Sequence, residues 1–180
     1  MVSKMVKNLL ILGAGQYGSV VKEVAEGMEI FDQIAFLDDG YGKEGICFLE
    51  KVIGKIADLE KYRDEYNYAI PAIGNAKFRR QLIEKIMENG FELPILVAKQ
   101  AYVAPSAHLA EGVVVEPLAG VHSNAVVDLG SYISMGAVVN HNAHVYECCH
   151  IDNNAVVKAA TVVEAMTKIN ACEVVYKLDK

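Results

Sequence analysis

The stretch VHSNAVVDLGSYISMGAVVNHNAHV, residues 121–145, decides the fold, because an aliphatic residue returns at every sixth position. This spacing extends over most of the second half of the chain, through Val103, Leu109, Val115, Val121, Val127, Ile133, Val139, Val145, Ile151, Val157, Val163, Ile169 and Val175. Four positions after each of the first twelve stands a small or β-branched residue, with Glu173 as the exception. Helices repeat every 3.6 residues and strands every two, so neither produces a period of six. The pattern predicts a left-handed parallel β-helix of hexapeptide repeats, in which three repeats form one triangular coil. At roughly 18 residues a coil, the run provides about four coils.

The first half of the chain alternates strand-like and helix-like segments. Buried-strand patterns cover 8–12, 33–37 and 68–73, and helical patterns cover 16–27, 77–89 and, as a short helix, 56–64. Such alternation predicts an α/β domain with a parallel sheet and crossover helices. We therefore predict two domains, a Rossmann-like half-domain over 1–98 and a β-helix over 99–180.

GAGQYG at 13–18 fits the dinucleotide-binding pattern G-x-G-x-x-G. Gly13 permits a tight turn, Gly15 lets a ligand approach the backbone, and Gly18 lets the helix pack on the strand, so that helix amides face a phosphate. Asp38 stands twenty residues after Gly18, where a ribose-binding acid is expected. NAD binding stays open as an alternative. A complete dinucleotide fold needs two halves over roughly 150 residues, whereas the repeat leaves room for one.

Composition restricts the class of partner and the compartment. Hydrophobic residues make up 53% of the chain and charged residues 22%, which predicts a packed core. A net charge of -6 argues against nucleic acid as a partner. The first apolar run is too short for a signal peptide or a membrane span, so we expect no membrane insertion. The four cysteines (Cys47, Cys148, Cys149 and Cys172) show no disulfide spacing, and we expect a cytoplasmic protein with reduced thiols.

HNAHVYECCH, residues 141–150, concentrates three histidines and two cysteines. Zinc binding is one interpretation, because His and Cys are its usual ligands. The repeat favours another, since Cys149 occupies an inward position while His144 and His150 point outward on successive faces. We therefore predict no metal site. A histidine on the outer wall of a β-helix instead suits general-base catalysis of acyl transfer from a thioester.

Taken together, the chain resembles the sugar O- and N-acyltransferases of the sialic acid O-acetyltransferase (NeuD) and bacillosamine-pathway (PglD-like) type. The resemblance rests on GAGQYG at 13–18, FLDD at 36–39, AIGNAKFRR at 72–80, ENGF at 88–91, PSA at 105–107 and NHNAHVYECCH at 140–150. It implies acetyl transfer from acetyl-CoA to a nucleotide-linked (amino) sugar, UDP-sugar-like, in bacterial surface glycan biosynthesis. It also implies a homotrimer with CoA between neighbouring subunits. Neither the sugar nor the choice between amine and hydroxyl follows from it.

The resemblance also assigns roles to residues of the first domain. It implies that Asp38 and Asp39 hold the uridine end of the substrate, and that Gly74, Asn75 and Arg79 line the same crevice. Tyr17 stands where the family usually has a histidine.

In the β-helix, the resemblance makes His141 the general base and places His150 near the acetyl group. Ala159 lies one coil beyond His141, where the family has a glycine whose amide approaches the acetyl oxygen. Asn142 replaces the family's carboxylate, and a neutral amide orients a ring without supplying charge. We expect the remaining histidines to be surface residues, namely His108, His122 and His144.

The last repeats, KAATVVEAMTKINACEVVYKLDK, contain no glycine, whereas the family carries further glycine-rich coils. Together with Asn142 and Ala159, this motivates an alternative function. In that alternative the chain is a non-catalytic nucleotide-sugar-binding or assembly module with a degenerate acyl-CoA site.

Overall fold

The computed structural model describes residues 6–42 and 51–176, so Cys47 lies outside the described residues. The chain divides into two compact units, Met1–Pro94 and Ile95–Lys180. The division falls four residues before the predicted boundary at 98/99, because the short strand β5 (Leu96–Val97) pairs with a strand of the second unit. Among the described residues, no helix has the length and hydropathy that crossing a bilayer requires.

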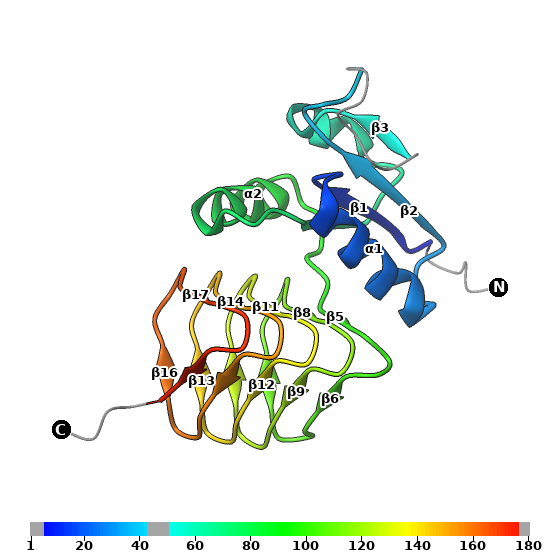
Figure 1. Cartoon of the computed structure of the whole chain (residues 1–180). Helices are drawn as coiled ribbons and strands as arrows, with labels where there is room; N and C mark the ends of the chain where they lie inside the picture. The colour runs from blue at the N-terminus through cyan, green and yellow to red at the C-terminus, as the bar shows by residue number, and fades with distance from the viewer. Residues whose placement is uncertain (1–5, 43–50, 177–180) are drawn as a thin grey trace. The chain divides into compact units, whose positions relative to one another are not determined.

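The first unit is an α/β domain around a parallel sheet (Figure 1). Its strands are β1 (Asn8–Leu12), β2 (Gln33–Leu37), β3 (Val52–Gly54) and β4 (Tyr68–Pro71), in the order β3-β2-β1-β4. The helices are α1 (Gln16–Met28) and α2 (Ala76–Glu88), with a 3-10 helix, η1 (Ile56–Tyr62). The predicted α/β half-domain is confirmed. β3 was missed, because three residues are too few to show a strand period.

β1 is the central strand, and its sequence shows why. NLLIL is buried along its whole length, as expected for a parallel strand covered on both faces. It pairs with β2 on one side and β4 on the other. After β1 the chain continues to β2 and β3 on one side of the sheet and then crosses to β4 on the other side of β1, which creates a topological switch point at the carboxyl ends of the strands.

The second unit is a β-helix of two-residue strands stacked in three parallel sheets (Figure 1). We name each sheet after its first strand. The β5 wall holds β5, β8 (Val114–Val115), β11 (Tyr132–Ile133), β14 (His150–Ile151) and β17 (Lys168–Ile169). The β6 wall holds β6 (Tyr102–Val103), β9 (Gly120–Val121), β12 (Val138–Val139), β15 (Val156–Val157) and β18 (Val174–Val175). The β7 wall holds β7 (His108–Leu109), β10 (Val126–Val127), β13 (His144–Val145) and β16 (Val162–Val163).

The aliphatic repeat forms the interior of this unit. Each of the predicted aliphatic positions is the second residue of a strand, and the central ones are fully buried in one cluster with the small residues between them. Successive side chains alternate between the two faces of a strand, so the first residue of each strand points outward. The predicted β-helix is confirmed. The repeat begins one unit earlier than predicted, because Val97 of β5 packs against the same cluster.

A positive φ also recurs at every sixth residue, in the turns that connect one wall to the next. Residues at 112, 118, 124, 130, 136, 142, 148, 154, 160, 166 and 172 all have positive φ. Each is the third residue of a tight turn; in one of them, for example, Ala143 N–H donates to the Asn140 carbonyl at 3.2 Å. A type II turn requires positive φ at this residue, which favours Gly and Asn. Several of these positions nevertheless carry side chains that pay a conformational cost, among them Ala160 at φ 53°.

Candidate functional site

In the turn between β1 and α1, the structure requires glycine at two of the three glycine positions, Gly13 and Gly18. Gly13 adopts φ +114°, and its N–H donates to the Leu37 carbonyl at 2.9 Å. A Cβ on Gly18 would collide with the Gly13 carbonyl oxygen. Gly15 differs, because a Cβ built there meets nothing within 4 Å and the residue is the N-cap of α1 without a side-chain cap. Gly15 therefore leaves the first amides of α1 open to an anion.

The acids after β2 shape this turn. Asp38 Oδ2 accepts a hydrogen bond from Ala14 N–H at 2.8 Å, and its Oδ1 accepts one from Gly40 N–H at 2.7 Å. Asp39 Oδ1 accepts a longer hydrogen bond from Ile56 N–H, at 3.3 Å. Asp39 is exposed, whereas Asp38 is half-buried. The structure thus places both acids at the carboxyl end of β2, with Asp38 bound to the backbone of the glycine turn.

The third predicted segment follows β4. Gly74 and Asn75 are exposed, and the Asn75 side chain caps α2 by accepting from Phe78 N–H at 3.0 Å. Arg79 is fully buried, and its Nη1 donates to the Ile73 carbonyl at 2.9 Å. The guanidinium therefore holds the shape of the loop from inside. These loops and the glycine turn meet at the carboxyl ends of β1, β2 and β4, where α/β sheets bind their ligands.

In the β-helix, His141 and Asn142 form the turn between the β6 wall and the β7 wall. We call the stack of such turns, residues 105–106, 123–124, 141–142 and 159–160, the β6/β7 corner. The ring of His141 is exposed, and its Nδ1 lies 3.1 Å from Asn142 Nδ2. The backbone of this turn is tied to the next coil, since Ala160 N–H donates to the His141 carbonyl at 3.1 Å.

Both the backbone conformation at position 142 and the contact with His141 suit an asparagine. Its φ is 56°, a left-handed value that asparagine tolerates better than most residues. Its amide can present either NH₂ or oxygen to the ring, so it accommodates both neutral tautomers of His141. A carboxylate at this position would accept only from a protonated Nδ1 and would thereby fix the tautomer.

Ala159 occupies the equivalent of position 141 one coil later, at the coil spacing of about 4.8 Å. The left-handed residue of its turn is Ala160, so an alanine at 159 needs no unusual backbone conformation. Among the described residues, Ala159 N–H donates no hydrogen bond. An amide donor thus lies open beside His141, which is the arrangement that stabilises an oxyanion.

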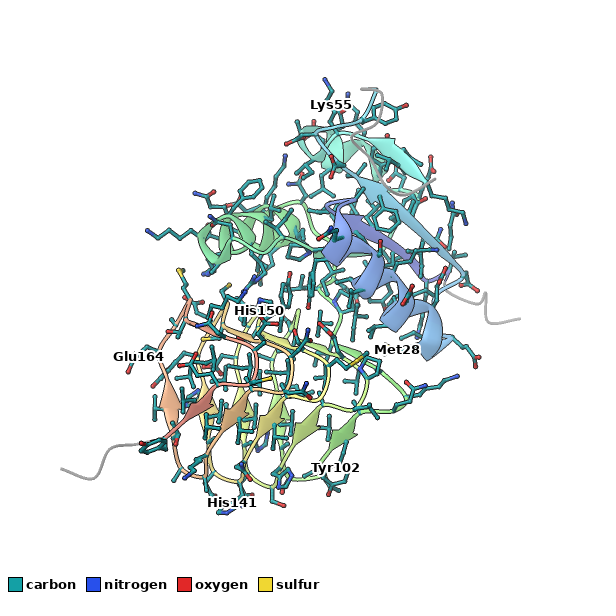
Figure 2. The ribbon with its side chains drawn as sticks, viewed as in Figure 1. Met28, Lys55, Tyr102, His141, His150 and Glu164 are labelled. Atoms are coloured by element: carbon teal, nitrogen blue, oxygen red, sulfur yellow. The ribbon has the colours of Figure 1, made fainter. Side chains whose placement is uncertain are left out.

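His150 lies on another wall. It begins β14, and its Nε2 lies 2.9 Å from the Ser134 hydroxyl, while its ring meets the edge of Tyr132 at 6.0 Å. The whole β7 wall separates it from His141, and Figure 2 shows the two histidines on opposite sides of the β-helix. Within one chain, the structure therefore does not bring His141 and His150 together.

The remaining histidines differ in their surroundings. His108 and His122 are exposed. His144 is half-buried; its Nε2 lies 2.7 Å from Asp128 Oδ2, and its ring stacks on Tyr146 at 4.2 Å. Asp128 and Ser134 were missed by sequence reasoning, although a signal exists. Each lies sixteen residues before its histidine, which is one coil less two residues, and Asp152 and Lys168 form an ion pair at 3.0 Å with the same separation.

The cysteines of the cluster are structural. Cys148 and Cys149 are buried and form no disulfide with another described cysteine, and Cys149 Sγ donates to the Glu164 carbonyl at 3.0 Å. Over residues 6–42 and 51–176, no group of three His, Cys, Asp or Glu side chains is arranged to hold a metal ion.

Comparisons with known proteins agree with this architecture. Residues 8–86 match the PglD N-terminal domain family, which confirms the resemblance predicted from the sequence. The acetyltransferase domain of PglB from Neisseria gonorrhoeae is 28% identical, with a TM-score of 0.83 over 94% of this chain and 91% of that one. Its complex with acetyl coenzyme A matches at 28% identity and a TM-score of 0.75, over 92% and 86% of the two chains. PerB from Caulobacter crescentus, in complex with CoA and GDP-perosamine, shares the fold at 24% identity and a TM-score of 0.79, over 98% and 92%.

Proposed function

We propose that this chain, which carries a PglD-type N-terminal domain, transfers an acetyl group from acetyl-CoA to a nucleotide-linked amino sugar. It would act in the cytoplasm on a precursor of a bacterial surface glycan. The observation that carries the proposal is the β6/β7 corner, where the exposed ring of His141 lies one coil from the open amide of Ala159. The similarity to an acetyl-CoA-binding acetyltransferase domain over nearly the whole chain supports it.

In the proposed acetyl transfer, the sugar nitrogen, His141 and the Ala159 amide each have one role. The sugar nitrogen attacks the thioester carbon, and His141 accepts the proton that the nitrogen loses. The Ala159 amide stabilises the oxyanion of the tetrahedral intermediate. When the carbon–sulfur bond breaks, the thiolate takes the proton from the His141 imidazolium, which leaves CoA thiol and an acetamido sugar.

The nucleotide would bind to the α/β unit. The open amides behind Gly15 suit a phosphate, and the acids Asp38 and Asp39 suit the hydroxyl and imide groups of a uridine. Gly74 and Asn75 border the same strand ends. Arg79 contributes by shaping that loop, because its guanidinium is buried.

A homotrimer would complete the site. Because the β7 wall separates His141 from His150 within one chain, both can serve one acetyl group only if neighbouring chains each contribute one. Parallel packing of β-helices around a three-fold axis would place such a composite site, with its CoA, between subunits.

The test is CoA thiol release by the purified protein with acetyl-CoA and a panel of UDP- and GDP-linked sugars, each offered as the amino and the hydroxyl form. We expect release with an amino sugar, loss of at least a hundredfold in His141→Ala, and wild-type activity in the control His122→Ala, which alters an exposed histidine of the β6 wall. Light scattering should show a trimer. Absence of thiol release with every acceptor, from protein that binds the sugars, would disprove the enzyme.

The neutral Asn142 motivates a second candidate, a non-catalytic nucleotide-sugar-binding or assembly module. Calorimetric titration separates the two: binding of UDP-sugar without binding of acetyl-CoA favours the module, and binding of both favours the enzyme.

A further inference from the structure

The last described coil of the β-helix differs from the earlier coils at one inward position. Glu173 follows a column of alanines that stack from coil to coil, namely Ala101, Ala119, Ala137 and Ala155. The last three of these alanines are buried in the core of the β-helix, whereas Glu173 is exposed. A further coil would bury the Glu173 carboxylate among aliphatic side chains, and burial of an unpaired charge is costly. Glu173 therefore opposes the addition of another coil.

The Glu173 carboxylate also binds a hydrogen-bond donor of the coil's open edge. In each earlier coil, the amide at one level of the β5 wall donates to a carbonyl of the next coil, as Asp152 N–H does to Ile169 at 3.0 Å. Asn170 N–H is the next amide in this column. It donates instead to Glu173 Oε2 at 3.0 Å, and Asn170 Nδ2 donates to the same oxygen at 3.1 Å. The carboxylate thus takes the place of the carbonyl that another coil would supply.

The surface around Glu173 is one end of the β-helix. β16, β17 and β18 are the last strands of their three walls (Figure 1). The inward residue Val163 is 4% exposed there, while Val145, one coil earlier, is 0% exposed. The N–H groups of Val162 and Val174, whose equivalents pair in the earlier coils, donate to no residue of the described part. An edge of this kind is a template for pairing with another chain.

A second copy of this chain is the partner that fits such an edge. It presents the same three strands at the same spacing, so all three walls can meet their equivalents at once. A contact between two like ends is closed by a two-fold axis, and it therefore joins two particles without forming a filament. The same contact would bring the Glu173 carboxylates of both copies into one interface, where like charges repel each other.

We propose that Glu173 caps the β-helix: it closes the last described coil and prevents this end from stacking on a second copy of the chain. The cap also keeps the candidate site open, because Ala159 and Ala160 form the last described turn of the β6/β7 corner. A copy stacked on the end would lie beside the Ala159 amide. The inference does not depend on acetyl transfer, since it rests on the hydrogen bonds and the burial of the last coil alone.

Replacement of the acid tests the cap. Glu173→Ala restores the alanine of the column, and sedimentation velocity at rising protein concentration should show it shifting to about twice the particle mass of the wild type. Glu164→Ala is the matched control, because Glu164 is an exposed acid of the same coil that points outward from the β7 wall. It should keep the wild-type mass at every concentration. Glu173→Thr introduces the residue type of Thr161 and Thr167 and should associate as Glu173→Ala does.

Two results would overturn the cap. One is a wild-type mass at every concentration in both Glu173 variants, with melting curves that show folded protein. The other is an equal rise in mass for Glu164→Ala, because loss of any acid from the coil would then suffice. If Glu173→Ala does not fold, the mass of Glu173→Thr decides. Acetyl transfer is measured separately, so that a capped protein without this activity overturns the proposed function alone.

Discussion

The turn at residues 159–160 allows a sharp test of the backbone argument, because two neighbouring exposed alanines differ only in conformation. Ala160 adopts φ 53°, whereas Ala159 lies outside the left-handed region. An L-residue in that region costs about 1–2 kcal/mol, and glycine avoids this cost. Glycine also makes the unfolded chain more flexible, which costs about 0.5–1 kcal/mol at either site.

Ala160→Gly should therefore stabilise the protein by about 0.5–1 kcal/mol, and Ala159→Gly should destabilise it by a similar amount. Because both methyl groups are exposed, no buried contact offsets the comparison. Urea unfolding at one fixed protein concentration measures the difference, as opposite shifts of the midpoint with an unchanged slope. Shifts of the same sign, or a destabilised Ala160→Gly, would refute the assignment of strain to this turn.

Three further predictions test the two sites. Gly18→Ala should lower the unfolding free energy by about 1–3 kcal/mol, while Gly15→Ala should keep the melting temperature and weaken UDP binding, measured by calorimetry. Asn142→Asp should raise kcat roughly 5- to 30-fold, from about 1–2 kcal/mol of added imidazolium stabilisation, whereas Asn154→Asp, at the same φ of 56° but at the corner between the β5 and β6 walls, should not. Burial raises the pKa of Asp152, but hydrogen bonds from a backbone amide and a lysine outweigh it and leave the pKa below 3.8. That stabilisation is present above pH 4 and lost as pH falls below it, so Asp152→Asn should reduce the acid sensitivity measured by unfolding at stepped pH.

The sequence predicts the β-helix well because one physical requirement repeats. Every coil must bury an aliphatic residue at each wall, so the period can be recognised in the sequence without knowing which strands pair. Only the repeat unit at Val97 was not predicted. β3 was not predicted, because a strand of only three residues, most of it half-buried, is too short to show a period. Its position follows from pairing with β2, which a single segment cannot reveal.

In the candidate site, the sequence indicates the chemistry of each single residue but does not reveal which side chains pair. His141 is recognisable from its local context. The pairing of Asp128 with His144 depends on knowing that one coil less two residues brings side chains together. Arg79 shows the converse, since a basic residue in a predicted ligand loop turned out to be buried among carbonyl groups of its own loop.

The ladder of the β-helix also bears on how the chain folds. Each of its strands meets a partner only eighteen positions away, as His144 meets Val162, whereas Leu9 of the first unit must find Tyr68. Contacts this local allow a coil to form wherever two turns first stack and then to add coils in either direction, as in other solenoids. Stability in the second unit should accordingly accrue coil by coil, while the sheet of the first unit forms only once its distant strands have met.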